Sequence, residues 1–209
     1  MGRKKVSVPV THIDADGVSS QRGGTVPAEE PLEIRIDGAS WATLTRTPRN
    51  DVELAHGLML ARGAIRCAEQ VEEACYCSDI HNYNTLDITL RPASGVAVQS
   101  PAPEKYLLEA LPALSGAVVL TDQVIAREDL FLINAVDKCI GTALMGTVAP
   151  SALVIGEVVT QEIVERALAA GIPTVATTVM VTSAAVTLAK RSGIALVGNL
   201  REQGQDVFA

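Results

Sequence analysis

The chain has 209 residues, of which 48% are hydrophobic, 20% charged and 3% aromatic, with a formal net charge of -7 at pH 7. This apolar content excludes a disordered chain and suffices for one large domain or two small ones. The acidic charge and few aromatic side chains argue against a nucleic-acid surface, because the basic run Arg3 to Lys5 is too short to offset them. We therefore expect a small molecule or a protein as partner.

The longest uncharged span, Ala167 to Ala189, could cross a bilayer by length alone. It contains Gly171, Pro173, Ser183 and five threonines, so a strand followed by a helix explains it better than a membrane span. The start of the chain shows no basic segment followed by an apolar core and cleavage site. We expect a cytoplasmic protein without membrane contact, whose four cysteines stay reduced.

Residues 1–25 contain four glycines and scattered polar residues, which predicts a flexible N-terminal arm with one edge strand at Val6 to Val10. Residues 26–100 predict a small α+β subdomain. In it, Leu32 to Ile36 and Trp41 to Thr45 alternate apolar and polar residues on either side of Asp37-Gly38, the pattern of a β-hairpin.

The next segment predicts a helix followed by two strands. Asn50 with Glu53 resembles a capping box, and the helix that it begins has Leu54, Leu58 and Ala61 on one face and ends at Gly63. Two strands follow at residues 71–78 and 84–90, joined by a polar turn at 79–83. The proline-rich loop 91–103 is the predicted boundary between the two halves.

The second half, residues 101–209, predicts an α/β domain. It begins with a helix at 104–111 and two paired strands at 117–120 and 124–126. Asn134 is positioned to cap the next helix, whose apolar face the pattern predicts to be Val136, Cys139, Ile140, Ala143 and Leu144, with Asp137 and Lys138 near its start.

Residues 152–201 read as a β-α-β-α-β module with strands at 152–156, 172–177 and 194–198. The predicted helix caps are Thr160 for the first helix, whose inward residues are Ile163, Val164, Ala167 and Leu168, and Thr182 or Ser183 for the second. Strands joined through helices run parallel, and ligands bind at their carboxyl ends. The predicted site at that edge is formed by Gly156, Thr182, Ser183, Gly198 and Asn199.

Several short motifs occur one after another along the chain. In the first half they are residues 29–38 (EEPLEIRIDG), Thr47-Pro48, 51–57 and 82–87; in the second they are 127–129, 134–138 with Gly141, 170–173, Gly193, 196–198 and 200–201. Together they resemble the formate dehydrogenase accessory sulfurtransferases, the FdhD/NarQ family. The resemblance implies that residues 101–209 form a cytidine-deaminase-like three-layer domain.

That family relays sulfur through a Cys-x-x-Cys loop, from a cysteine desulfurase to the molybdenum-pterin guanine dinucleotide cofactor of formate dehydrogenase. The loop should fall between Leu90 and Glu104, where this sequence has no cysteine. The family's Gly-Arg-His is here Phe131-Leu132-Ile133, and its Ser-Gly-Arg is here Ile155-Gly156-Glu157. The resemblance thus implies a member that has lost the sulfur relay and part of an anion site.

The resemblance also implies a set of ligands and partners. They are the molybdenum cofactor or a guanine nucleotide, held without a covalent bond, and formate dehydrogenase and a cysteine desulfurase. Asn134, Asp137 and Lys138 are candidate cofactor-binding residues, although a helix cap and surface charges explain them equally well. Thr182 and Ser183 read first as a helix cap and second as a phosphate site.

The cysteines and histidines carry weaker signals. A metal site could be proposed from Cys67, Cys75, Cys77 and His81. The spacing of the cysteines is more typical of small hydrophobic side chains in a core than of metal ligands, so we expect no metal. Cys139 lies on an apolar helix face, which leaves Cys67 as the thiol expected near solvent. No histidine can be assembled into a catalytic set, and the His-x-Glu and Pro-Cys-x-x-Cys signature of the deaminases is absent.

Two functions remain, and both belong to molybdoenzyme maturation. The first is a non-catalytic cofactor-binding or scaffold protein, which the missing cysteine pair favours; the second is an active sulfur carrier. An unrelated ligand-binding module on a shared fold is a third reading, because a fold does not fix a function. The high apolar fraction and mean hydropathy of +0.26 predict a homodimer.

Overall fold

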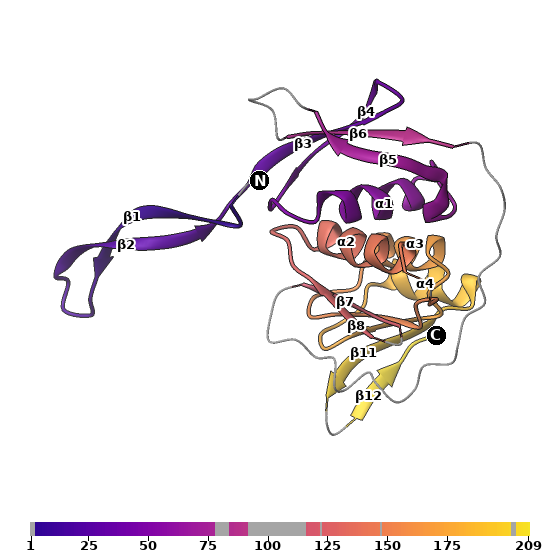
Figure 1. The fold of residues 1–209 in the computed structure, drawn as a ribbon. Coiled ribbons are helices and arrows are strands. Elements are labelled where there is room, and N and C mark those ends of the chain that lie inside the picture. The colour runs from indigo at the N-terminus through magenta and orange to yellow at the C-terminus, as the bar shows by residue number, and fades with distance from the viewer. Residues whose placement is uncertain (1–2, 78–83, 92–115, 122, 147, 202–203) are drawn as a thin grey trace.

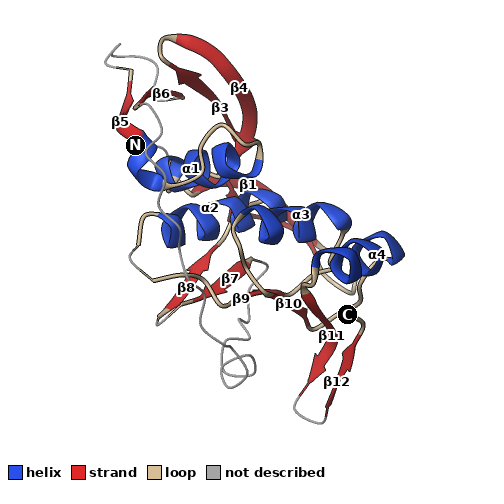
Figure 2. Ribbon diagram, turned by 90° about the vertical axis from the view of Figure 1, so that its right-hand side faces the viewer, coloured by secondary structure: helices blue, strands red, loops and turns tan. Residues whose placement is uncertain are grey.

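The computed structural model describes residues 3–77, 84–91, 116–121, 123–146, 148–201 and 204–209. The body is mixed α/β and has four layers: a four-stranded sheet, helix α1, a row of three helices, and a six-stranded sheet (Figures 1 and 2). No helix in the described ranges is long and apolar enough to span a membrane.

The four-stranded sheet has the order β4-β3-β6-β5. Strands β3 (Glu30–Ile36) and β4 (Ala39–Arg46) form the predicted antiparallel hairpin, and Asp37 and Gly38 turn it with φ of 49° and 81°. Strands β5 (Val71–Tyr76) and β6 (Thr85–Leu90) pair antiparallel as predicted, and β6 runs parallel to β3. The predicted turn at 79–83 lies outside the described residues.

Helix α1 (Asp51–Ala61) fills the second layer, and the short 3-10 helix η1 (Ala68–Gln70) follows it. The helix was predicted, but the capping box was wrong. Asn50 has a left-handed backbone (φ 57°), and its amide donates to Glu53 Oε1 at 2.7 Å without capping a backbone N–H. Because α1 lies between the sheet and α2, eight of its residues are buried and it has no polar face.

Helix α2 (Leu132–Leu144) packs directly on α1. A β-carbon placed on Gly141 would overlap the carbonyl of Glu53, and one on Gly57 would overlap the carbonyl of Asp137. The two backbones therefore touch where they cross, which only glycine permits. The prediction that Asn134 caps α2 was wrong, because the helix begins at Leu132 and the carboxylate of Asp129 accepts from the N–H of Phe131 at 3.0 Å.

The six-stranded sheet has the order β12-β11-β10-β9-β7-β8. Strands β7 (Ala117–Leu120) and β8 (Val124–Arg127) form the predicted antiparallel pair. The β-α-β-α-β module is confirmed as β9 (Ala152–Ile155), α3 (Gln161–Ala169), β10 (Thr174–Thr177), α4 (Ser183–Ser192) and β11 (Ala195–Arg201), with its strands parallel.

Four details of this part of the chain differ from the prediction. Strand β11 extends to Arg201, so Gly198 and Asn199 lie within it, and an additional strand β12 (Gly204–Val207) pairs antiparallel at the edge. Leu168 is 48% exposed, although it was predicted to face inward. Thr160 occupies the cap position of α3 without a side-chain hydrogen bond.

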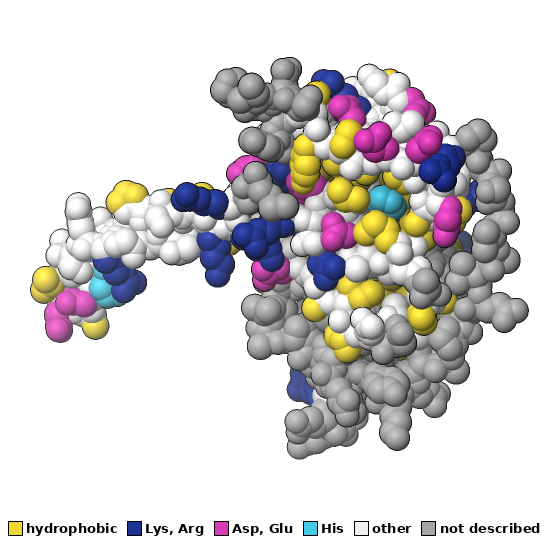
Figure 3. All heavy atoms as spheres, viewed as in Figure 1, with side chains coloured by type: hydrophobic (Ala, Val, Ile, Leu, Met, Phe, Trp, Pro, Cys, Tyr) yellow, Lys and Arg dark blue, Asp and Glu magenta, His cyan; other side chains and the backbone are white. Residues whose placement is uncertain are grey.

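The N-terminal arm is an antiparallel hairpin of β1 (Lys5–Ile13) and β2 (Ser19–Pro27) that projects clear of the body (Figures 1 and 3). The predicted strand at Val6 to Val10 lies within β1. Strand β2 was not predicted, because Ser19, Ser20, Gly23 and Gly24 give it no alternating pattern.

One hydrophobic core joins the two halves of the body. Leu54 of α1 and Leu86 of β6 belong to the same buried cluster as Ile140 of α2 and Leu153 of β9. A second cluster, which includes Val154 and Ala176, lies on the opposite face of the six-stranded sheet. The loop predicted at 91–103, beyond Arg91, and the helix predicted at 104–111 lie outside the described residues.

Candidate functional site

A cavity of about 560 Å³ lies at the carboxyl end of β9, where the parallel module was predicted to bind its ligand. We call it the β9 cavity. It is formed by the start of α2, the loop after β9, the start of α3 and the loop after β10, and its described lining is Leu132, Ile133, Gly156, Glu157, Val158, Thr160, Glu162, Ile163 and Val179.

Backbone hydrogen bonds join the two loops of the cavity. The N–H of Val159 donates to the carbonyl of Met180 at 3.1 Å, and the N–H of Thr182 donates to the carbonyl of Val159 at 3.0 Å. The hydroxyl of Thr177 at the end of β10 donates to the carbonyl of Glu157. The shape of the cavity therefore follows from the ends of two adjacent parallel strands.

The charges at the cavity are acidic. Glu157 and Glu162 are the charged side chains in its described lining. Arg166 of α3 pairs with Glu162 (Nη2 to Oε1, 3.4 Å) and with the buried Asp137 (Nε to Oδ1, 3.2 Å). Burial raises the pKa of Asp137 to about 6, and Arg166 opposes that shift. A diphosphate such as that of a guanine dinucleotide would meet carboxylates here, so the described residues do not fit that group.

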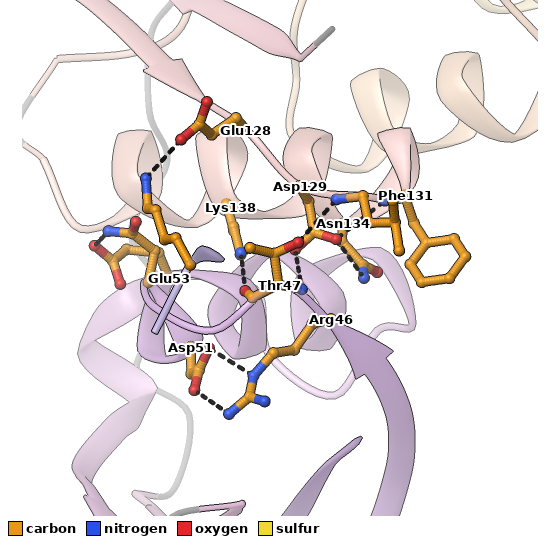
Figure 4. Close-up of polar contacts among 12 residues, drawn as sticks. Arg46, Thr47, Asp51, Glu53, Glu128, Asp129, Phe131, Asn134 and Lys138 are labelled. Atoms are coloured by element: carbon orange, nitrogen blue, oxygen red, sulfur yellow. Dashed lines mark hydrogen bonds and ion pairs between the residues drawn. The ribbon is translucent and has the colours of Figure 1, made fainter. Parts of the chain in front are cut away.

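Asn134 and Lys138 belong to a buried polar network between the two halves (Figure 4). At its centre Asp129 accepts from Lys138 Nζ at 2.7 Å, from the N–H of Thr47 at 3.1 Å and from the Asn134 amide at 3.3 Å. Lys138 Nζ also donates to the carbonyl of Thr47 at 2.9 Å, and the Asn134 amide to that of Thr45 at 2.8 Å. These hydrogen bonds join the two halves of the body, and none of these residues lines the β9 cavity.

A second buried pair stands beside this network. Arg46 donates to both carboxylate oxygens of Asp51, at 3.1 and 2.9 Å, and the hydroxyl of Tyr76 donates to the same carboxylate at 2.9 Å. Burial, followed by the charge of Asp51, raises the pKa of Tyr76. The hydroxyl is therefore protonated at neutral pH and serves as a donor to Asp51.

The other predicted site residues are dispersed. Thr182 caps α4, because its hydroxyl accepts from the N–H of Ala185 at 3.3 Å, and Ser183 is exposed beside it. Gly198 is buried against Phe208. Asn199 lines a separate polar pocket with residues of the β11–β12 hairpin. Of the predicted edge, Gly156 alone lines the β9 cavity in the described structure.

Two of the four cysteines are buried. Cys139 is buried as predicted; burial raises its pKa to about 12, and its thiol donates to the carbonyl of Ala117 at 3.0 Å. The prediction for Cys67 was wrong, because its side chain is buried, whereas Cys75 on β5 is exposed. Partial desolvation on the sheet surface, followed by the negative charge of Glu73, raises the pKa of Cys75. Within the described residues no three His, Cys, Asp or Glu side chains cluster as a metal site would require.

Comparisons with known proteins show that the fold and the sequence both have relatives. The fold is similar, with a TM-score of 0.80 and 21% identity, to a crystal structure from Desulfotalea psychrophila whose title names a formate dehydrogenase accessory protein, over 99% of this chain and 97% of that one. The chain is 33% identical to a Mycolicibacterium paratuberculosis relative named "Sulfur carrier protein FdhD", over 95% of this chain and 94% of the relative. A Streptomyces avermitilis relative of the same name is 31% identical, over 100% of this chain and 95% of the relative.

The sequence model of the FdhD/NarQ family matches residues 108–209. The chain belongs to the FdhD/NarQ family. Its alignment with the Mycolicibacterium relative extends over 258 positions and is longer than the chain itself, so the relative carries internal residues that this chain lacks.

The two segments that the sequence resemblance marks as departures, 131–133 and 155–157, both contribute to the β9 cavity. Leu132, Ile133, Gly156 and Glu157 line it. The resemblance already interpreted both departures as the loss of part of an anion site, but the sequence did not indicate which surface they form. Glu162 and Val179 were missed altogether, because they lie on neighbouring loops with no motif of their own.

Proposed function

We propose that this chain is an accessory protein of formate dehydrogenase maturation that acts as a scaffold for protein partners and does not relay sulfur. The observation that carries the proposal is the described lining of the β9 cavity, which has neither a thiol nor a cation. Sulfur relay needs an accessible thiolate, and the phosphates of a molybdenum-pterin guanine dinucleotide are best held by cations.

The positions of the four cysteines support the same function. A relay cysteine must ionise near neutral pH and reach two partners in turn. Cys67 and Cys139 are buried, and Cys75 is fixed on a strand with its pKa raised. We also propose that the six-stranded sheet and its helices are a cytidine-deaminase-like domain that serves as a scaffold without deaminase chemistry.

The exposure of Cys75 favours one alternative, a sulfur carrier that works through this thiol. Its thiolate would attack the persulfide of a cysteine desulfurase, take the outer sulfur as its own persulfide, and release the desulfurase thiolate. A second thiol would then be needed to release the sulfur to an acceptor. Cys77 lies two residues further on and is partly buried.

Incubation of the full chain with a cysteine desulfurase and cysteine, followed by intact mass spectrometry, separates the two functions. We expect no stable gain of one sulfur (~32 Da), and no difference between the wild type and Cys75→Ser. A stoichiometric gain that disappears in Cys75→Ser and passes to a molybdenum cofactor would establish the sulfur carrier instead.

Two binding measurements test the scaffold itself. Formate dehydrogenase, immobilised without its cofactor, should retain the chain, and the Cys75→Ser variant should bind with the same affinity. GDP should leave the melting temperature unchanged, because a ligand that binds the folded state raises it. Failure to bind formate dehydrogenase would refute the proposed scaffold role. An increase of the melting temperature with GDP would indicate a cofactor-binding function instead.

A further inference from the structure

The β1–β2 hairpin, which we call the arm, has no hydrophobic core of its own. Its strands pack closely on each other, and in the described part of the chain neither packs closely on another element. Each strand has nine residues, so the arm is about 30 Å long, compared with a radius of gyration of about 16 Å for a body of this size. A two-stranded hairpin is marginally stable alone in water, so an arm of this length needs a surface to cover.

One face of the arm is a row of valines. The register pairs Val6 with Val26, Val8 with Gly24 and Val10 with Arg22, and these residues share one face because side chains alternate along a strand. Val6 and Val26 are 41% and 39% exposed. Apart from Pro9 and Ile13, the opposite face presents polar side chains, among them Ser7, Thr11 and their partners on β2. The arm is therefore amphipathic, and its apolar face is uncovered.

The charge of the arm is opposite to that of the body. Residues 3–27 carry four Arg or Lys and two Asp, a net charge of +2, so residues 28–209 carry -9 of the total of -7. Pro9 in the middle of β1 has no N–H to offer a third strand, which favours docking through the valine face over addition of a strand.

The β9 cavity has the chemistry that this arm requires. Leu132, Ile133 and Val179 supply apolar lining, and Glu157 and Glu162 supply negative charge. The surface next to the cavity is apolar as well, since Leu130, Phe131 and Met180 are 47%, 41% and 60% exposed. An exposed apolar area with charged residues beside it is typical of a protein-binding surface.

We propose that the arm of one copy lays its valine face on the β9 cavity of a second copy, and that the exchange is mutual in a two-fold dimer. Lys4 at the base of the arm pairs with Glu128 at 2.9 Å, in the segment that leads into α2 and the cavity. Arm and cavity therefore emerge on the same side of the body, as a reciprocal exchange requires. This dimer does not depend on the proposed function.

Sedimentation at micromolar concentration tests the valine face. The wild type should be a dimer, and Val8→Glu should raise the dimer Kd about tenfold or more because it places a charge in the interface. Ser7→Glu, one residue away on the polar face, is the matched control and should leave the Kd within about twofold. A monomeric wild type, or a dimer equally insensitive to both substitutions, would overturn the proposal.

A mixed cross-link tests where the arm docks, and remains informative if Val8→Glu fails to fold. One chain carries Val8→Cys and the other Val179→Cys, both with Cys75→Ser and Cys77→Ser. Oxidation should join the two chains, whereas Ser7→Cys in place of Val8→Cys should not. Equal cross-linking from both arm positions, or none from Val8→Cys, would refute docking of the valine face on the cavity.

Discussion

Replacing Lys138 by Met removes the cation of the buried network and leaves the carboxylate of Asp129 without its ion-pair partner. Both side chains are almost fully inaccessible, at 2% and 0% exposed. Breaking a buried pair from one side costs about 3–5 kcal/mol. Asp129 keeps N–H donors from Thr47, Phe131 and Asn134, so we expect the lower end, about 3 kcal/mol.

Urea unfolding at pH 7 measures this loss. With an m-value of about 2 kcal/mol/M, the midpoint should fall by about 1.5 M with m unchanged. Lys190→Met, on the exposed face of α4, is the control and should change stability by less than about 0.5 kcal/mol. Adding Asp129→Asn to Lys138→Met should cost less than the two single effects together, because no carboxylate then remains buried.

The opposite result would change the assignment of these residues. If Lys138→Met cost less than about 1 kcal/mol, the pair would contribute little to the contact between the halves. A ligand-binding role for Lys138 and Asn134, which the sequence suggested, would then have to be reconsidered.

Three further predictions follow from packing and ionisation. Gly141→Ala should destabilise by about 3 kcal/mol in urea unfolding, because the new methyl meets the backbone of α1, whereas Gly23→Ala, with open space around it, should cost about 1 kcal/mol or less. Because burial raises the pKa of Asp137 from 3.8 to about 6, the wild type should lose about 2 kcal/mol relative to Asp137→Asn as pH rises from 4 to 6, and about 3 kcal/mol over the range from about pH 3 to 7; a flat difference would contradict the raised pKa. Iodoacetamide should modify Cys75 in the native protein, faster as pH rises above 8, whereas Cys139 should react only after unfolding, and peptide mass spectrometry reads both.

Elements with a local pattern could be predicted from the sequence. The Asp37-Gly38 hairpin and the β-α-β-α-β module follow from alternation, helical periodicity and glycine stops within a few residues. Strand β12 could not be predicted, because Gly204 to Val207 is too short and polar to stand out and owes its conformation to pairing with β11.

The site was harder to predict than the fold, for a physical reason. In the sequence, Lys138 resembles a charged residue on the exposed face of a helix. In the structure it is covered by a segment that includes Thr47, 91 residues earlier in the chain, whose carbonyl accepts a hydrogen bond from it. The β9 cavity likewise collects residues from four segments, each of which is ordinary alone. Local patterns predict which face of an element is apolar, but they do not indicate which distant segment will cover it.

The backbone contact of α1 and α2 has a consequence for synthesis on the ribosome. Chain growth delivers α1 together with most of the four-stranded sheet long before Gly141 and the rest of α2 are made. Until then, the face of α1 around Gly57 has no cover, although it is fully enclosed in the finished protein. We therefore expect the nascent first half to expose an apolar face that chaperones can bind and proteases can reach until translation passes α2.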